Sequence, residues 1–101
     1  MMLFNGIMKN KIGEIAGKIW KILGEKEDVE ILKLPQILKE KGEIVYQALG
    51  WLAREDKINY HSKEKKTFVS LSYDEREMFR NSLKASLGQD LRENSSKQQE
   101  M

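Results

Sequence analysis

The sequence predicts a mostly helical α+β domain in which three helices, a short strand and a β-hairpin share one core, followed by an additional C-terminal helix. Two observations predict this fold. Apolar residues recur at intervals of three and four in several segments, which is the spacing that lines one face of a helix. Between these segments lie short runs that alternate apolar and polar residues or are rich in β-branched and aromatic residues, as strands are.

Length and composition limit the class of protein. The 101 residues predict one domain, because domains usually hold about 100 to 200 residues. Hydrophobic residues make up 40% of the chain, enough for a core, and the 34% of charged residues excludes a membrane-embedded protein. The absence of cysteine excludes a disulfide framework and a thiolate metal site. We therefore expect the protein to be soluble and to act in the reducing cytoplasm.

The first helix is predicted between Lys11 and Leu23, where the apolar residues share one face. Gly24 follows directly and is typical of a residue that ends a helix. Gly13 and Gly17 lie on the flank of the apolar face, where missing side chains would let another backbone approach closely. Residues 1–10 are expected to form an N-terminal arm, because they lack the cationic start and cleavage site of a secretory signal.

A helix-turn-helix is predicted next. Val29–Ile31 alternates apolar and polar residues and suits a very short strand. Leu34–Lys41 predicts a two-turn helix with Pro35 in its first turn, where proline is tolerated. Gly42 interrupts, and the apolar pattern that follows predicts a third helix from about Glu43 to Glu55. Two helices joined by a tight glycine-bearing turn are the elements of a helix-turn-helix.

A β-hairpin follows the third helix. Ile58–His61 alternates, Ser62–Lys65 is typical of a polar turn, and Lys66–Leu71 is rich in β-branched and aromatic residues. The lone upstream strand is expected to pair with this hairpin, which then forms a wing. The order of elements over residues 11–73 is that of a winged helix-turn-helix domain.

The remaining residues predict a fourth helix and a tail. Ser72–Glu75 has the pattern of a capping box, so a C-terminal helix is expected over 74–93. Its apolar residues recur every four positions and need a covering surface, either this domain or a second copy. They are Phe79, Leu83, Leu87 and Leu91. Residues 94–101 are polar without periodicity, and we expect them to be disordered.

Two stretches carry a family resemblance. The runs IGEIAGKIW, from Ile12 to Trp20, and ALGWLARE, from Ala48 to Glu55, resemble an uncharacterised prokaryotic family of winged helix-turn-helix domains. The similarity covers roughly Lys11 to Tyr73. It implies the winged-helix fold and, through that architecture, DNA binding. The fourth helix lies beyond the shared region.

DNA contacts are expected from the solvent face of the third helix and from the wing, since winged helices place that helix in the major groove and the wing on the backbone or in the minor groove. Arg54 and Gln47 have the chemistry to contact base edges, Tyr46 could contact a phosphate, and the lysines of the wing could neutralise phosphates. The predicted DNA-binding residues are Tyr46, Gln47, Gly50, Arg54, Lys63, Lys65 and Lys66.

Other observations favour a second hypothesis. The net charge is only +2, and Glu43 at the leading end of the third helix would repel phosphates. Gly50 at the centre of the exposed face admits two explanations, the close approach of a DNA edge or the tight packing of a partner helix. The sequence therefore predicts either a DNA-binding regulator, dimeric through its first or fourth helix, or a protein-interaction or dimerisation module that does not bind DNA.

No pattern indicates catalysis. Trp20 and Trp51 fall on or beside apolar stripes and are expected to pack in the core. His61, the only histidine, is expected on an exposed strand and cannot assemble a metal site alone. The carboxylates after Ser72 suit the first turn of a helix. We expect no enzymatic activity, no metal, no cofactor and no small-molecule ligand.

Overall fold

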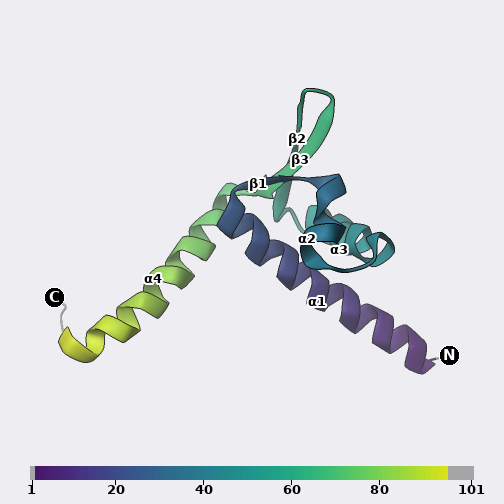
Figure 1. Ribbon diagram of the computed structural model, residues 1–101. Coiled ribbons are helices and arrows are strands. Elements are labelled where there is room, and N and C mark those ends of the chain that lie inside the picture. Colours follow the sequence, from purple (N-terminus) through teal and green to yellow (C-terminus); the bar gives the residue numbers. More distant parts are fainter. Residues whose placement is uncertain (1, 96–101) are drawn as a thin grey trace.

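The computed structural model describes the backbone of residues 2–95 and the side chains of residues 3–85 (Figure 1). The predicted order of α-helices and strands is confirmed, but the 3-10 turn η1 was not predicted, and Ile31, expected at the end of the first strand, belongs to it. The helices are α1 (Met2–Lys26), the 3-10 turn η1 (Ile31–Lys33), α2 (Leu34–Leu38), α3 (Gly42–Arg54) and α4 (Tyr73–Ser95). The strands are β1 (Asp28–Glu30), β2 (Ile58–Lys63) and β3 (Lys66–Leu71).

The three strands form one antiparallel sheet in the order β1-β3-β2. Val29 of β1 pairs with Val69 of β3, and Ile58 of β2 pairs with Leu71. These four side chains are buried, so this face of the sheet covers the helices, as alternation along a strand requires. Between Val69 and its turn, the hairpin projects from the domain and forms the wing (Figure 1).

The core lies between α1, α3 and the sheet. Ile15, Ile19 and Leu23 of α1 are fully buried, and they meet Val45 and Leu49 of α3. Each fully buried aliphatic side chain contributes roughly 1.5–3 kcal/mol relative to exposure. The predicted apolar faces of the first and third helices are therefore confirmed as core faces.

The bounds of α1 differ from those predicted. The helix begins at Met2, so residues 2–10, expected as an arm, form its first turns. It also continues past Gly24 to Lys26, and the left-handed residue after it is Glu27, with φ 73°. Gly24 is needed for a different reason, because a Cβ there would overlap the ring of Phe79 from α4.

The turn between α2 and α3 also differs in detail. The helix α2 ends at Leu38, three residues earlier than predicted, because Lys39 adopts a left-handed conformation with φ 58°. Gly42 is the first residue of α3 and does not have a positive φ. Its missing side chain instead leaves room for the ring of Tyr46, whose Cε2 would lie 3.2 Å from a Cβ at Gly42.

One carboxylate attaches this turn to α1. Glu40 accepts a hydrogen bond from Lys18 Nζ at 3.1 Å and lies 3.5 Å from Lys11 Nζ. The hydrogen bond from Lys18, with the nearby charge of Lys11, lowers the pKa of Glu40. These pairs help to fix the helix-turn-helix relative to α1.

Only one of the two hydrogen bonds of the predicted capping box is present at the start of α4. The amide of Glu75 donates to Ser72 Oγ at 3.4 Å, but the Glu75 carboxylate does not return to the Ser72 amide. It accepts a hydrogen bond from Trp20 Nε1 at 2.7 Å instead, and this joins α4 to α1. The ring of Phe79 adds an edge-to-face contact with Trp20, with centroids 5.3 Å apart.

The expected apolar face of α4 is only partly covered by the domain. Phe79 is 9% exposed, whereas Leu83 is 50% exposed. The side chains of Leu87 and Leu91 lie outside the described residues. Of the expected tail, residues 94 and 95 belong to α4, and residues 96–101 lie outside the described residues. Within the part of the chain that the structure describes, no helix is long and apolar enough to cross a membrane.

Candidate nucleic-acid interface

The predicted residues of the third helix lie together on the solvent side of α3. Their opposite neighbours Val45, Ala48, Leu49 and Leu52 are buried, and the helical period therefore turns the remaining positions outward. The exposed residues of this face are Glu43, Tyr46, Gln47, Gly50 and Arg54.

Two of these residues are already engaged, and two are open. Gln47 Nε2 donates to the backbone oxygen of Glu43 at 3.2 Å. The ring of Tyr46 lies over Gly42, and the residue remains 39% exposed. Nothing lies within 4 Å of a Cβ built on Gly50, so the centre of this face is open to an approaching surface. Arg54, in the last turn, makes no ion pair with the described residues.

The wing ends in a two-residue turn that gathers the predicted lysines. The strands β2 and β3 run up to the cross-strand pair Lys63 and Lys66. Glu64 and Lys65 connect them with φ values of 54° and 66°. Positive φ at both central residues is the feature of a type I′ turn, whose twist matches that of a hairpin. The turn thus places three lysines and one glutamate at the projecting tip (Figure 1).

The lysines of the tip have different surroundings. The ammonium of Lys63 lies 5.0 Å from the centre of the Phe68 ring, a cation–π arrangement. Lys65 and Lys66 are exposed, and neither forms an ion pair with any residue that the structure describes. None of the three lysines at the tip therefore has a carboxylate partner among the described residues.

The base of the wing is braced by His61. Its Nε2 lies 3.0 Å from Asp28 Oδ2 of β1, and its ring stacks on Phe68 at 5.8 Å between centroids. Because β3 lies between β1 and β2, this contact joins the two outer strands across the sheet. The prediction of a strand position for His61 is confirmed, but no sequence pattern indicated Asp28 as its partner.

The basic surface does not extend to α1. Lys11 and Lys18, which could have enlarged it, converge on Glu40, and the tip of the wing points away from α1 (Figure 1). Acidic residues also flank α3, with Glu43 at its start and Glu55 after its end. Among the residues described, no group of three potential ligands could hold a metal ion.

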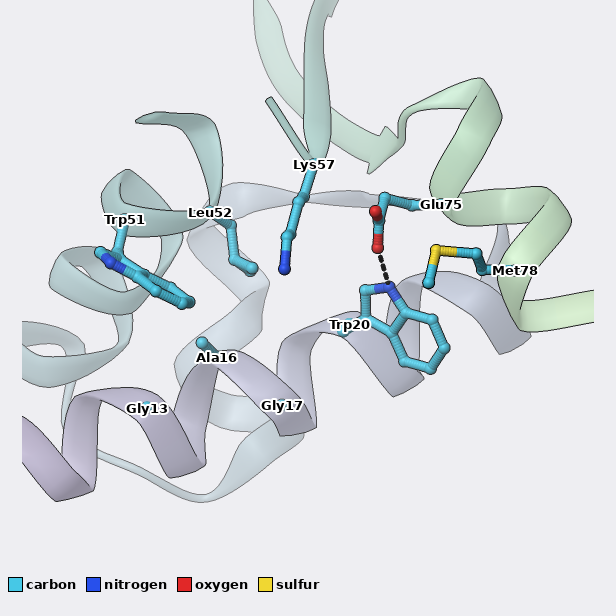
Figure 2. A pocket seen from close by; sticks show the side chains of 9 residues that line it. All are labelled: Gly13, Ala16, Gly17, Trp20, Trp51, Leu52, Lys57, Glu75 and Met78. Carbon is cyan, nitrogen blue, oxygen red and sulfur yellow. Dashed lines mark hydrogen bonds between the residues drawn. The ribbon is translucent and has the colours of Figure 1, made fainter. Parts of the chain in front are cut away.

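Sequence reasoning missed a groove between α1, α3 and α4 (Figure 2). Trp51, expected in the core, is 46% exposed and borders the groove, because it lies beside the buried face formed by Ala48, Leu49 and Leu52 and not on it. The expected close approach at Gly13 and Gly17 is wrong, since nothing lies within 4 Å of a Cβ at either residue. A sequence pattern shows which helix face is apolar, but it does not show how far apart two packed helices lie.

Comparison with known families agrees with this architecture. Residues 7–71 match the family described as winged helix-turn-helix domain (DUF2582). The chain belongs to this family. The matched residues span most of α1, the helix-turn-helix and the wing, and they end before α4. A relative from Methanocaldococcus jannaschii, the uncharacterized protein MJ1608, is 45% identical over 69 residues, which cover 63% of this chain and 94% of the relative.

Solved structures of other proteins share the fold. The protein BT2368 of Bacteroides thetaiotaomicron is 32% identical with a TM-score of 0.56, over 63% of this chain and 78% of its own. Lactococcus lactis ZitR, at 18% identity and a TM-score of 0.62, covers 94% of this chain and 79% of its own. The transcriptional regulator HlyU from Vibrio vulnificus, at 20% identity and a TM-score of 0.61, covers 82% and 86%.

Proposed function

We propose that this winged-helix protein is a DNA-binding transcriptional regulator without enzymatic activity, in which α3 enters the major groove and the wing contacts the phosphate backbone. The exposed face of α3 offers Tyr46, Gln47, Gly50 and Arg54 to base edges and phosphates. The wing offers Lys63, Lys65 and Lys66. The likeness of fold to HlyU, which is described as a transcriptional regulator, supports a regulatory role.

The observation that carries this proposal is the concentration of unpaired cations at the wing tip. Lys63 and Lys66 are directly opposite across the hairpin, where like charges are unfavourable. Glu64 and Lys65 hold positive φ without being glycine, which costs about 1 kcal/mol each. The folded chain supplies no carboxylate partner for Lys65 or Lys66 among its described residues. A phosphate backbone would supply the opposite charge.

We propose a homodimer as the DNA-binding form. Apolar side chains at the start of α1 and on α4 face solvent: Leu3 is 75% exposed, Phe4 66%, Ile7 55% and Leu83 50%. The two helices extend from the domain in different directions (Figure 1), so their free turns could pack on a second copy. Two copies would double a DNA contact that one small module makes only weakly.

Charge-removing variants test the role of the wing. Replacing Lys63, Lys65 and Lys66 together by Met should weaken binding to a mixed-sequence duplex uniformly across sequences. It should also reduce the slope of log K against log salt by up to about 3, since each lost phosphate contact reduces it by about 0.9. The readout is fluorescence anisotropy over a range of salt concentrations.

The matched control is the replacement of Lys9, Lys21 and Lys84, which are exposed on α1 and α4 and change the net charge equally. The control should bind as the unmodified protein does. Equal losses in both triple variants would mean that net charge alone attracts DNA, and the wing would have no specific role.

A second candidate function rests on the open surface around Gly50 and Tyr46, which could receive a helix from a protein partner. Salt dependence separates the two functions. A partner that stays bound at high salt and is lost in Gly50→Leu would favour a protein-interaction module, whereas DNA binding should fall steeply with salt.

A further inference from the structure

The groove between α1, α3 and α4 has the size and lining of a small-molecule site. Its volume is about 320 Å³, within the range of roughly 300–1,000 Å³ that ligand pockets have. The groove is open on one side, and α1 lines it with small residues. The lining residues are Gly13, Ala16, Gly17, Trp20, Trp51, Leu52, Lys57, Glu75 and Met78.

Aromatic surfaces stand at opposite ends of this groove. Trp51 borders it from α3, and Trp20 borders it from α1 (Figure 2). Between them, Gly13 and Gly17 leave open space, because a Cβ at either residue would touch nothing within 4 Å. A flat ring could therefore lie on α1 between the two indoles, and aromatic rings gain from such edge and face contacts.

Two charged groups also face the groove. Lys57 is partly buried and points into it between Trp51 and Glu75 (Figure 2), with its ammonium 5.8 Å from the centre of the Trp51 ring. It forms no ion pair with the described residues. Oε1 of Glu75 accepts a hydrogen bond from the indole N–H of Trp20. The other carboxylate oxygen of Glu75 accepts no hydrogen bond from the described side chains. The groove thus presents one cation without an ion-pair partner and one carboxylate oxygen that is free to accept a hydrogen bond.

We propose that this groove binds a small aromatic carboxylate that also carries a hydrogen-bond donor. The ligand's carboxylate would pair with the Lys57 ammonium in a charge-assisted hydrogen bond. Its ring would lie over Gly13 and Gly17, and its hydroxyl or amine would donate to the free oxygen of Glu75. Because Lys57 has no ion-pair partner among the described residues, an acid would gain a charge pair there that a neutral aromatic would not.

The test uses the two indole N–H signals, because the chain contains only two tryptophans. The full-length ¹⁵N-labelled protein is titrated with 4-hydroxyphenylacetate, 4-methylphenol and phenylacetate at millimolar concentrations. We expect saturable shifts of both indole signals with 4-hydroxyphenylacetate, weaker binding of phenylacetate, which lacks the donor, and about tenfold weaker binding of 4-methylphenol, which lacks the carboxylate.

Two variants locate the site. Lys57→Met should weaken 4-hydroxyphenylacetate about tenfold, to the level of 4-methylphenol, while Lys21→Met, on the exposed side of α1, should leave binding unchanged. Gly17→Leu should abolish binding by filling the groove, yet keep or raise the melting temperature because leucine favours a helix more than glycine does. Gly6→Leu is its control, since it lies in the same helix with open space around it and outside the groove.

Three outcomes would overturn the proposal. The first is no saturable indole shift with 4-hydroxyphenylacetate. The second is equal affinity for 4-methylphenol, or unchanged affinity in Lys57→Met, since either would remove the role assigned to the charge. The third is an indole shift that follows protein dilution without any added acid, because it would mean that a second copy of the chain occupies the groove.

Discussion

Individual glycines in α1 have different structural roles that the sequence does not distinguish. Three glycines lie in or beside the apolar pattern of the helix, and their local sequences do not distinguish them: Gly13, Gly17 and Gly24. Only Gly24 meets another element, the ring of Phe79. The contact depends on where α4 returns to the domain, which no local pattern in α1 encodes.

The difference predicts opposite effects of the same substitution. Gly17→Ala should stabilise the protein by about 1 kcal/mol, or roughly 4–8 °C in melting temperature, because alanine favours the helix and finds open space. Gly24→Ala gains the same propensity but displaces the Phe79 ring, so it should lower the melting temperature. Thermal unfolding of both variants by circular dichroism measures this, and a rise in both would contradict the packing at Gly24.

The carboxylate of Glu40 gives the stability of the protein a dependence on acid pH. Its folded-state pKa is lowered, first by the hydrogen bond from Lys18, so the stability that it contributes is present above its ordinary pKa. That contribution is lost as the pH falls through the lowered folded-state pKa. Glu40→Gln should therefore lower the melting temperature at neutral pH, and the difference from the unmodified protein should shrink on acidification.

The measurement is a series of melting curves from neutral to acid pH. Glu14→Gln is the matched control, because its carboxylate is 60% exposed and lies 3.8 Å from Lys11. A difference for Glu40→Gln that stayed constant with pH would mean that the amide disturbs packing and that the ion pairs contribute nothing.

At the scale of elements, the sequence predicted each α-helix and strand but not the 3-10 turn η1 or the residue at which each element ends. Apolar periodicity depends on several residues, and it placed α3 within one residue at each end. Three ends depend on single residues in left-handed conformations, namely Glu27, Lys39 and Asp56. None of them is glycine or asparagine, the residues that signal such a conformation, so the ends of α1 and α2 were misplaced.

The turn of the wing also holds two non-glycine residues, Glu64 and Lys65, in left-handed conformations, so a substitution there can stabilise it. Replacing Glu64 and Lys65 by Asn and Gly, the residues that a type I′ turn prefers, should stabilise the hairpin by about 1–2 kcal/mol without changing the net charge. Thermal unfolding measures the gain. Replacing both residues by alanine keeps the unfavourable φ values and should bring no gain, and a lower melting temperature in the Asn-Gly variant would argue against this turn type.

For the whole molecule, the candidate interface was predictable because the buried face of α3 defines the exposed one. The predicted residues of α3 and the wing are indeed exposed, while their contact with DNA stays a prediction. The groove was not predictable, since it arises from three elements that are distant in the sequence. The extension of α1 to Met2 was also missed, because its first turns carry apolar residues that the domain leaves uncovered.

The exposed apolar residues at the start of α1 and on α4 predict self-association. Leu83→Asp should shift the protein toward the monomer, because it places a charge in an apolar contact between copies. Light scattering after size-exclusion chromatography measures the mass. Leu32→Asp is the control, since Leu32 is 70% exposed on η1, away from both free helix ends, and its variant should keep the mass of the unmodified protein.

The most direct test of the proposed function is fluorescence anisotropy of the unmodified protein on mixed genomic duplex fragments, at low and at physiological salt. The proposal predicts submicromolar binding at low salt that weakens as salt rises, because wing lysines displace counterions from the phosphates. Absence of binding at low salt would contradict it, and the surface of Tyr46 and Gly50 would then be assigned to a protein partner.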